Sequence, residues 1–298
     1  MIREVPTLDD GRAALAALTV GQALRRAAAR LADAGLPEPR ADAEVLLAHV
    51  LSIDRQLLVL RVQEPLAPEL AARFEALLAR RLQREPTAQL VGVREFWSLP
   101  FRVDRRVLIP RPETELVVET ALAVAPGATR VLDVGTGSGV LAVALARELP
   151  RARVVALDRS PGALAIAREN VQQLAPRVRL VCGDLLAAIA SCTFDLVVAN
   201  PPYVPTAEIA RLAPELRDYE PRLALDGGAD GLAVIRALLA EVPRVLLAGG
   251  WLVFELGAGQ AGTVVQEAAR ETVWGPARVV RDLAGIERVM ALQRQGGR

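Results

Sequence analysis

The sequence predicts an α/β protein in which a doubly wound, Rossmann-like parallel sheet follows a small N-terminal helical bundle and a hairpin-like connector. From Glu113 onward, short apolar strands alternate with helical stretches, as in parallel strands joined by crossover helices. From Val20 to Leu82, by contrast, apolar residues recur at helical spacing. The expected boundaries are residues 1–85 for a substrate-docking helical domain, 86–110 for the connector and 111–298 for the α/β domain.

The helical domain is predicted from two sets of apolar residues, each of which falls on one helix face. These sets are Val20, Leu24, Ala27 and Leu31, and then Leu70, Phe74, Leu77 and Leu78. Gly35-Leu36-Pro37 is a typical helix stop between them. Between residues 88 and 105, apolar residues alternate loosely around Gly92 and Pro100, which favours a hairpin.

The composition of the chain limits the classes of protein to which it can belong. A chain of 298 residues that is 52% hydrophobic and 24% charged is expected to form about two globular domains. No long uncharged apolar run is present, and the first residues lack a secretory pattern, so we expect no membrane association. Two cysteines, Cys182 and Cys192, form neither a disulfide framework nor a metal set, which favours the cytoplasm and no metal. The net charge of +1 indicates no general attraction for nucleic acid.

A glycine-rich loop follows the predicted strand Val131–Val134 and precedes a helical pattern. It consists of Gly135, Thr136, Gly137, Ser138 and Gly139. Glycines at such a turn let a ligand approach the backbone closely. The spacing G-x-G-x-G after an acid is tighter than the dinucleotide fingerprint and suits a small zwitterion better than a pyrophosphate. We interpret it as a loop that binds S-adenosyl-L-methionine, with a phosphate loop or an ordinary tight turn as alternatives.

Two further acids follow the next two predicted strands. Asp158 ends a strand 23 positions after Gly135, where a carboxylate can accept both hydroxyls of a ribose. The following Ser160-Pro161 is typical of a helix start, so Asp158 can equally serve as a helix N-terminal charge. Asp184-Leu185 follows the third strand, in a position to meet an adenine. The carboxyl ends of strands are where open α/β sheets bind ligands.

The segment Asn200-Pro201-Pro202-Tyr203 comes directly after the apolar strand 194–199. The side-chain oxygen of Asn200 and the backbone carbonyl of Pro201 can each accept one N–H of a planar NH2 group. The ring of Tyr203 can stack on the flat face of that group. This pattern predicts a pocket that presents an amide or amine nitrogen to a methyl donor, although a strand that merely ends in prolines is the structural alternative.

Together, D-x-G-T-G-S-G, the strand-end Asp158 and N-P-P-Y resemble the HemK-type family of protein glutamine N5-methyltransferases, the PrmC family. The resemblance spans roughly Val20 to Val289, and one departure is Leu185, where an aromatic residue often covers the adenine. It also includes Arg84-Glu85-Pro86, Glu95-Phe96, the stretch 107–115, Glu220-Pro221, the stretch 225–228, Gly249-Gly250 and the stretch 282–285.

The resemblance implies a seven-stranded methyltransferase sheet whose last two strands form an antiparallel hairpin. It implies S-adenosyl-L-methionine as cofactor and S-adenosyl-L-homocysteine as product. The implied substrate is the glutamine of the Gly-Gly-Gln motif in class 1 translation release factors, and we expect a monomer. The cofactor would be held by the glycine loop, Asp158, Asp184, Leu185 and Asn200.

Two other functions remain to be weighed. The same N-P-P-Y chemistry serves exocyclic amines of DNA or RNA, but such enzymes usually carry a basic recognition region, which is not evident here. A non-catalytic adaptor could keep the fold without turnover, but the glycine loop and N-P-P-Y segment are intact, which argues against it.

Overall fold

The computed structural model describes residues 18–187 and 189–296, and these divide into two compact units. The first unit ends at Val91 and the second begins at Gly92. The expectation that the N-terminus lacks a secretory pattern concerns residues 1–17, which lie outside the described part of the chain.

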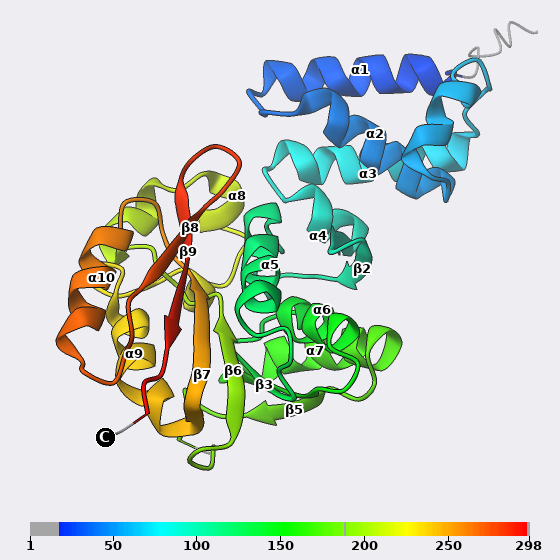
Figure 1. Cartoon of the computed structure of the whole chain (residues 1–298). Coiled ribbons are helices and arrows are strands. Elements are labelled where there is room, and N and C mark those ends of the chain that lie inside the picture. The colour runs from blue at the N-terminus through cyan, green and yellow to red at the C-terminus, as the bar shows by residue number, and fades with distance from the viewer. Residues whose placement is uncertain (1–17, 188, 297–298) are drawn as a thin grey trace, which may run out of the picture. The chain divides into compact units, whose positions relative to one another are not determined.

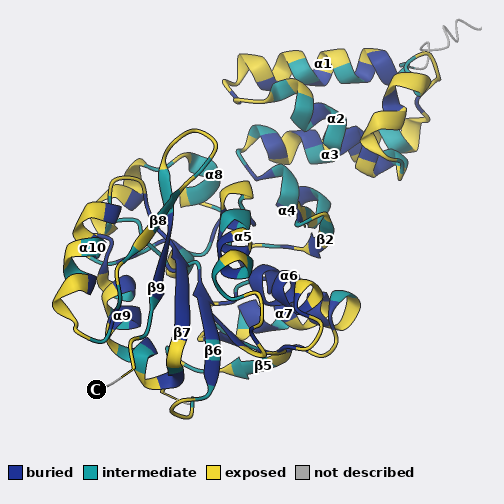
Figure 2. Cartoon of the chain, in the orientation of Figure 1, coloured by how far each residue is buried: buried dark blue, intermediate teal, exposed yellow. Residues whose placement is uncertain are grey.

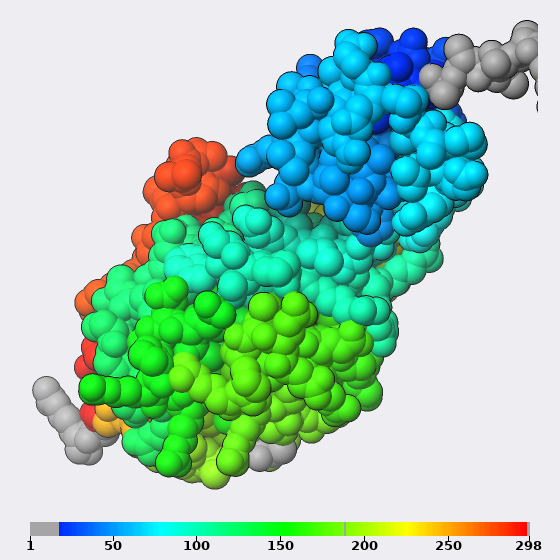
Figure 3. Space-filling view, turned by 90° about the vertical axis from the view of Figure 1, so that its right-hand side faces the viewer, coloured from blue at the N-terminus to red at the C-terminus, as the bar shows by residue number. Residues whose placement is uncertain are grey.

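The first unit is helical, as predicted. Its elements are α1 (Val20–Asp33), α2 (Pro39–Leu51), η1 (Arg55–Arg61), α3 (Pro68–Leu82) and α4 (Thr87–Val91). Helix α1 starts with a capping box in which the Thr19 side chain accepts a hydrogen bond from the Gln22 backbone and the Gln22 side chain accepts one from the Thr19 backbone. Leu31, Phe74 and Leu78 from the predicted helix faces are buried in its core. The space-filling view shows the helices as one closely packed body, coloured blue to cyan (Figure 3).

The second unit begins with the predicted hairpin, formed by β1 (Val93–Phe96) and β2 (Leu99–Arg102) in antiparallel register. The two residues between the strands, Trp97 and Ser98, both have positive φ, as the tight turns of hairpins require. Phe96 and Phe101 pack edge to face, with ring centroids 6.1 Å apart, inside the core of this unit.

A seven-stranded mixed sheet forms the centre of the second unit, in the order β5-β4-β3-β6-β7-β9-β8 (Figure 1). The five strands β3, β4, β5, β6 and β7 are parallel, whereas β9 is antiparallel to β7 and β8 is antiparallel to β9. The closing antiparallel hairpin is thereby confirmed. The bounds are β3 (Arg130–Val134), β4 (Arg153–Asp158), β5 (Arg179–Cys182), β6 (Phe194–Ala199), β7 (Leu246–Glu255), β8 (Arg278–Arg281) and β9 (Glu287–Gln293).

Helices cover both faces of this sheet (Figure 1). One face carries α5 (Glu115–Val124), α6 (Val140–Glu148) and α7 (Pro161–Leu174), and the other carries α9 (Ala233–Val245) and α10 (Ala261–Arg270). Successive strand residues enter opposite cores: Val131 belongs to the cluster that includes α5 and α6, and Leu132 to the cluster that includes α9. The central strands of the sheet are accordingly coloured as buried in Figure 2. The short elements η2 (Pro112–Thr114), η3 (Thr206–Arg211), α8 (Pro214–Arg217) and η4 (Arg222–Ala224) complete the unit.

The strand order creates a switch point beside β3. From β3 the chain moves outward to β4 and β5 and then returns to the other side of β3 as β6. Crossover loops diverge at such a point and leave a crevice at the carboxyl ends of the strands. The predicted fold class is confirmed, and among the described residues no helix is long and apolar enough to cross a membrane.

Candidate functional site

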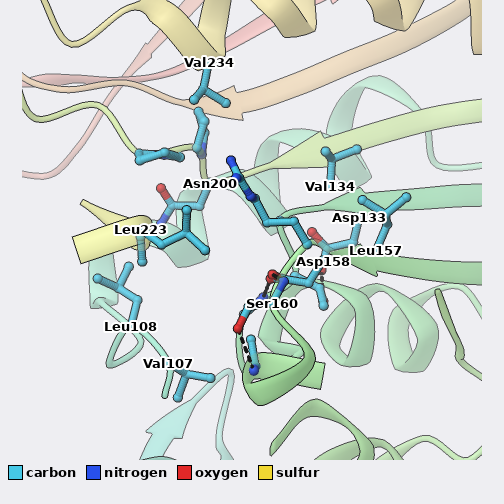
Figure 4. Close-up of a pocket in the computed structure, with 18 of the residues that line it drawn as sticks. Val107, Leu108, Asp133, Val134, Leu157, Asp158, Ser160, Asn200, Leu223 and Val234 are labelled. Carbon is cyan, nitrogen blue, oxygen red and sulfur yellow. Dashed lines mark hydrogen bonds between the residues drawn. The ribbon is translucent and has the colours of Figure 1, made fainter. Parts of the chain in front are cut away.

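A cavity of about 360 Å³ lies at the carboxyl ends of β3, β4, β5 and β6. The close-up shows apolar side chains, among them Val107, Leu108 and Leu223, on one side of it, and Asp133, Leu157 and Asp158 on the other (Figure 4). The cavity is also lined by ten predicted site residues: Gly135, Thr136, Gly137, Ser138, Asp158, Asp184, Leu185, Asn200, Pro201 and Pro202. Gly139 and Tyr203, also predicted, are not among the lining residues.

The glycine loop has three left-handed residues with two different consequences. Gly135, Gly137 and Gly139 have φ of 73°, 57° and 90°. A β-carbon at Gly135 or Gly137 would meet no atom within 4 Å, so the backbone there is open to a ligand. A β-carbon at Gly139 would lie 3.6 Å from the side chain of Ala167 on α7, an ordinary packing distance, so glycine is favoured there by its positive φ rather than by lack of space.

Asp158 anchors the glycine loop. Its carboxylate accepts hydrogen bonds from the backbone N–H of Gly137 at 2.9 Å and from that of Ser160 at 2.8 Å. The Ser160 side chain in turn accepts from the backbone of Ala163 and caps α7, with Pro161 in the first turn. Asp158 therefore joins the loop to the start of α7, and each carboxylate oxygen keeps a lone pair for a further donor.

Asp133 is the acid that precedes the loop, and it carries an unused acceptor. Its Oδ2 accepts from the Thr136 hydroxyl at 2.6 Å and from the Ala142 backbone at 3.1 Å. Its Oδ1 is buried and has no hydrogen-bond partner. Burial raises the pKa of Asp133 to about 7. A buried acceptor on the cavity wall suits a cationic donor, and the acid before the first glycine is the sequence signal for it.

Asp184 and Leu185 lie on the cavity wall directly after β5. The side chain of Asp184 is 69% exposed and lies 3.8 Å from the guanidinium of Arg159. Leu185 has a left-handed backbone with φ of 45°, which is uncommon for a branched residue. The structure thus places both residues on the cavity wall, and their contact with an adenine stays a prediction.

Asn200 lies at the end of a chain of hydrogen bonds that are buried or partly buried. Its Nδ2 donates to the Thr114 hydroxyl at 3.0 Å, and that hydroxyl donates to the Glu255 carboxylate at 2.6 Å. The Tyr203 hydroxyl donates to the other oxygen of Glu255 at 3.1 Å. Burial raises the pKa of the Glu255 carboxyl and that of the Tyr203 hydroxyl.

Sequence reasoning assigned no role to Thr114 or Glu255. Both are 2% exposed. Glu255 ends the apolar strand β7, and a lone acid at the end of such a strand was the available signal. The ring of Tyr203 packs on the core under α9 rather than lining the cavity. Its predicted stacking on a planar substrate group stays a prediction.

An ion pair whose carboxylate is buried and whose arginine is partly exposed fixes one wall of the cavity. Arg111 donates to Glu220 in a short contact, and the backbone N–H of Ile109 lies 3.4 Å from the same carboxylate. Burial raises the pKa of Glu220, while the charge of Arg111 opposes this shift. The pair joins the segment before α5, which carries Leu108, to the segment after α8, which carries Leu223.

Within residues 18–187 and 189–296, no group of three or more His, Cys, Asp or Glu side chains could hold a metal ion. The polar lining consists of the carboxylates of Asp133, Asp158 and Asp184, the guanidinium groups of Arg106, Arg111 and Arg159, serine and threonine hydroxyls, glycine backbone and the Asn200 amide. Such a set can hold a zwitterionic ligand and orient a planar N–H donor beside it.

The second unit therefore has the architecture of a methyltransferase domain, and the comparisons agree. A family model described as "Methyltransferase small domain" matches residues 112–216, and one described as "PrmC N-terminal domain" matches residues 22–92. A solved methyltransferase from Pyrococcus furiosus superposes with a TM-score of 0.53 at 19% identity, over 73% of this chain and 98% of that one. The catalytic domain of hMettl16, solved in complex with MAT2A 3'UTR hairpin 6, gives a TM-score of 0.54 at 18% identity, over 72% of this chain and 81% of that one. At these identities the likeness concerns the fold.

Sequence relatives identify the family. A release factor glutamine methyltransferase of Geobacter sulfurreducens is 46% identical over 260 residues, which cover 87% of this chain and 91% of that protein. The protein of that name from Cereibacter sphaeroides is 48% identical over 280 residues, or 92% and 98% of the two chains. The chain belongs to the release factor glutamine methyltransferase family, and the resemblance found in the sequence is confirmed.

Proposed function

We propose that this protein transfers a methyl group from S-adenosyl-L-methionine to the side-chain amide nitrogen, N5, of the glutamine in the Gly-Gly-Gln motif of class 1 release factors. The observation that carries the proposal is the placement of Asn200, Pro201 and Pro202 on the wall of the same cavity as the open glycine loop. Family membership supplies the substrate. The enzyme would act in the cytoplasm, as a monomer and without a metal.

The cavity fits the cofactor at three points. The Oδ1 of Asp133, which is buried and has no hydrogen-bond partner, would accept from the ammonium of the methionine moiety. The open backbone at Gly135 and Gly137 leaves room for the ligand. Asp158 keeps lone pairs for ribose hydroxyls, and Asp184 and Leu185 would lie near the adenine. When bound, this cofactor supplies a methyl group on a positively charged sulfur.

The substrate amide requires orientation because its nitrogen lone pair is delocalised into the carbonyl. The Asn200 side-chain oxygen and the Pro201 carbonyl would each accept one N–H, which holds the nitrogen in line for attack and stabilises the positive charge that develops on it. Methyl transfer would form the N–C bond as the S–C bond breaks and leave a neutral thioether, and the surplus proton on the nitrogen would pass to solvent only when the product leaves the site. The apolar wall with Leu108 and Leu223 would exclude water from this position.

Selection of one glutamine among many requires contacts far from the amide, because the cavity reads only the side chain. The helical unit offers an exposed apolar patch on η1, formed by Leu57, Val59 and Leu60, which are 44%, 68% and 77% exposed. We propose that this patch docks the body of the release factor, so that remote binding energy positions the glutamine.

The test is methylation of defined substrates by the purified protein. Labelled cofactor is offered with unmodified release factor, and separately with DNA and RNA, and the labelled residue is mapped by mass spectrometry. We expect label only on the glutamine of Gly-Gly-Gln, and none on a factor in which that glutamine is replaced by alanine. Label on an adenine or guanine amine would establish the nucleic-acid alternative, and cofactor binding without any transfer would establish the adaptor.

A further inference from the structure

The hydrogen bonds behind Asn200 have a defined direction. An ionised carboxylate can only accept hydrogen bonds, so the Thr114 hydroxyl must donate its one proton to Glu255. The Thr114 oxygen can then only accept, and the group that faces it must be a donor. The donor is the NH2 of Asn200, which lies 3.0 Å away. The remaining group of the Asn200 amide, its carbonyl oxygen, is left for the cavity.

We propose that Thr114 and Glu255 are positioning residues that fix the Asn200 amide with its oxygen toward the substrate. This inference rests on the proposed function, since the amide orientation matters only if a substrate N–H is to be accepted. Without this relay the two ends of an asparagine amide have nearly the same shape, and the flipped amide would present NH2 to the NH2 of the substrate. The flipped state would leave the Pro201 carbonyl as the one acceptor for the glutamine NH2, so it would hold the nitrogen less well.

The fold supports such a relay with residues from separate segments. The strands β6 and β7 are parallel neighbours in which Ala199 pairs with Phe254, so the next residues, Asn200 and Glu255, follow side by side at the strand ends. Thr114 enters from the end of η2 and bridges them. Glu255 is 2% exposed and does not line the cavity, so it acts through Thr114 rather than on the substrate.

Tyr203 strengthens the same arrangement. Its hydroxyl donates to Glu255 and occupies the carboxylate oxygen that Thr114 does not use. Both oxygens of Glu255 are thereby engaged as acceptors. The positive charge of Arg288, on β9, favours the ionised form of Glu255, whereas the negative charge of Glu113 disfavours it. Tyr203, at the end of the N-P-P-Y motif, thus helps to orient Asn200, at its start, through Glu255, which lies 52 residues after the tyrosine.

The decisive comparison is between Thr114→Val and Thr114→Ser. Valine has nearly the shape of threonine but no hydroxyl, whereas serine keeps the hydroxyl. We expect Thr114→Val to lower kcat for release factor methylation about tenfold, the equivalent of one net hydrogen bond of about 1.4 kcal/mol. Thr114→Ser should stay within about twofold of the wild type. Calorimetry should give cofactor dissociation constants within about twofold for all three proteins, because the relay does not hold the cofactor.

The outcomes separate the relay from a merely structural role and from the proposed function. Equal kcat values for the valine and serine variants would overturn the relay, as would a valine variant that loses cofactor affinity and turnover together. A wild-type protein that does not methylate release factor would refute the proposed function instead. Circular dichroism melting is the check that both variants are folded.

A second measurement does not depend on the threonine variants. A protonated Glu255 can donate to Thr114, whose hydroxyl proton would then turn to the Asn200 oxygen and flip the amide. With cofactor saturating, kcat of the wild type should therefore fall as the pH drops through the pKa of Glu255, which burial raises. In Glu255→Gln this acid limb should be absent and kcat lower throughout. An unchanged acid limb in that variant would overturn the relay.

Discussion

Replacing Asp158 by alanine should loosen the glycine loop and weaken cofactor binding together. The carboxylate is 8% exposed and accepts two backbone hydrogen bonds, from Gly137 and from Ser160. A hydrogen bond to a charged group contributes about 1.5–3 kcal/mol. Water in the open cavity can replace part of the lost hydrogen bonding to the Gly137 backbone, so we expect the free energy of unfolding to fall by about 3 kcal/mol in total. For a unit of this size that corresponds to a Tm lower by about 6–12 °C.

The cofactor should bind more weakly for two reasons. The loop has to be ordered at the moment of binding, and the predicted bonds to the ribose are lost. A combined loss of about 1.5–3 kcal/mol corresponds to a dissociation constant raised about tenfold to 150-fold. Calorimetric titration with S-adenosyl-L-homocysteine measures this without turnover. The matched control is Asp158→Asn, which keeps the shape and one acceptor oxygen but loses the charge, and it should fall between wild type and alanine in both measurements.

Two results would refute this reasoning. If Asp158→Ala lowers the Tm but leaves the dissociation constant unchanged, Asp158 is only an anchor for the loop and the start of α7. If affinity falls while the Tm is unchanged, the two backbone hydrogen bonds carry no stability, and the account of the loop is wrong.

Three further substitutions test other parts of the molecule. Asn200→Ala should reduce kcat at least 100-fold, because the Asn200 oxygen acts on the transition state, while calorimetry should show a cofactor affinity within about threefold of the wild type. Abolished cofactor binding would instead show that Asn200 mainly holds the cofactor. Arg111→Gln strands the buried Glu220 and should lower the unfolding free energy in urea by about 3 kcal/mol at pH 8. The loss should be smaller at pH 5, where the stranded carboxyl, whose pKa burial raises, takes up a proton; an equal loss at both pH values would contradict this. The double variant Val59→Ser with Leu60→Ser should raise KM for intact release factor severalfold but leave a Gly-Gly-Gln peptide unaffected; equal effects on both would exclude docking by η1.

Strand positions were predictable because the apolar runs are short, regular and closed by glycine, acid or proline. The run 194–199 before Asn200 became β6 with these bounds, and the strand before Gly135 became the C-terminal part of β3. The closing hairpin came from family resemblance rather than from periodicity. Nothing local in 278–281 and 287–293 states that these strands run antiparallel to the rest.

The site was predictable where its residues lie in short motifs at the ends of predicted strands. The glycine loop, Asp158 and Asn200 each stand at a strand end, and parallel topology brings strand ends together. The two hydrogen bonds of Asp158 to backbone were not predictable, because they depend on how the loop folds back toward β4. The same holds for Arg111 and Glu220, which lie 109 residues apart and meet only in the folded wall.

The orientation of Asn200 shows most clearly what a motif leaves open. N-P-P-Y fixes which groups are near the cavity, but an asparagine amide has an acceptor end and a donor end, and the motif cannot state which end faces inward. That choice is made by Thr114, 86 positions earlier, and by Glu255, at the end of the neighbouring strand. A protein with the same motif but an apolar residue in place of Thr114 would form a similar cavity, but the orientation of its asparagine amide would not be fixed. The acceptor that faces the Asn200 NH2 from behind, the Thr114 oxygen, is therefore as much a condition for accepting a substrate N–H as the motif itself, and comparing Thr114→Val with Thr114→Ser measures its contribution.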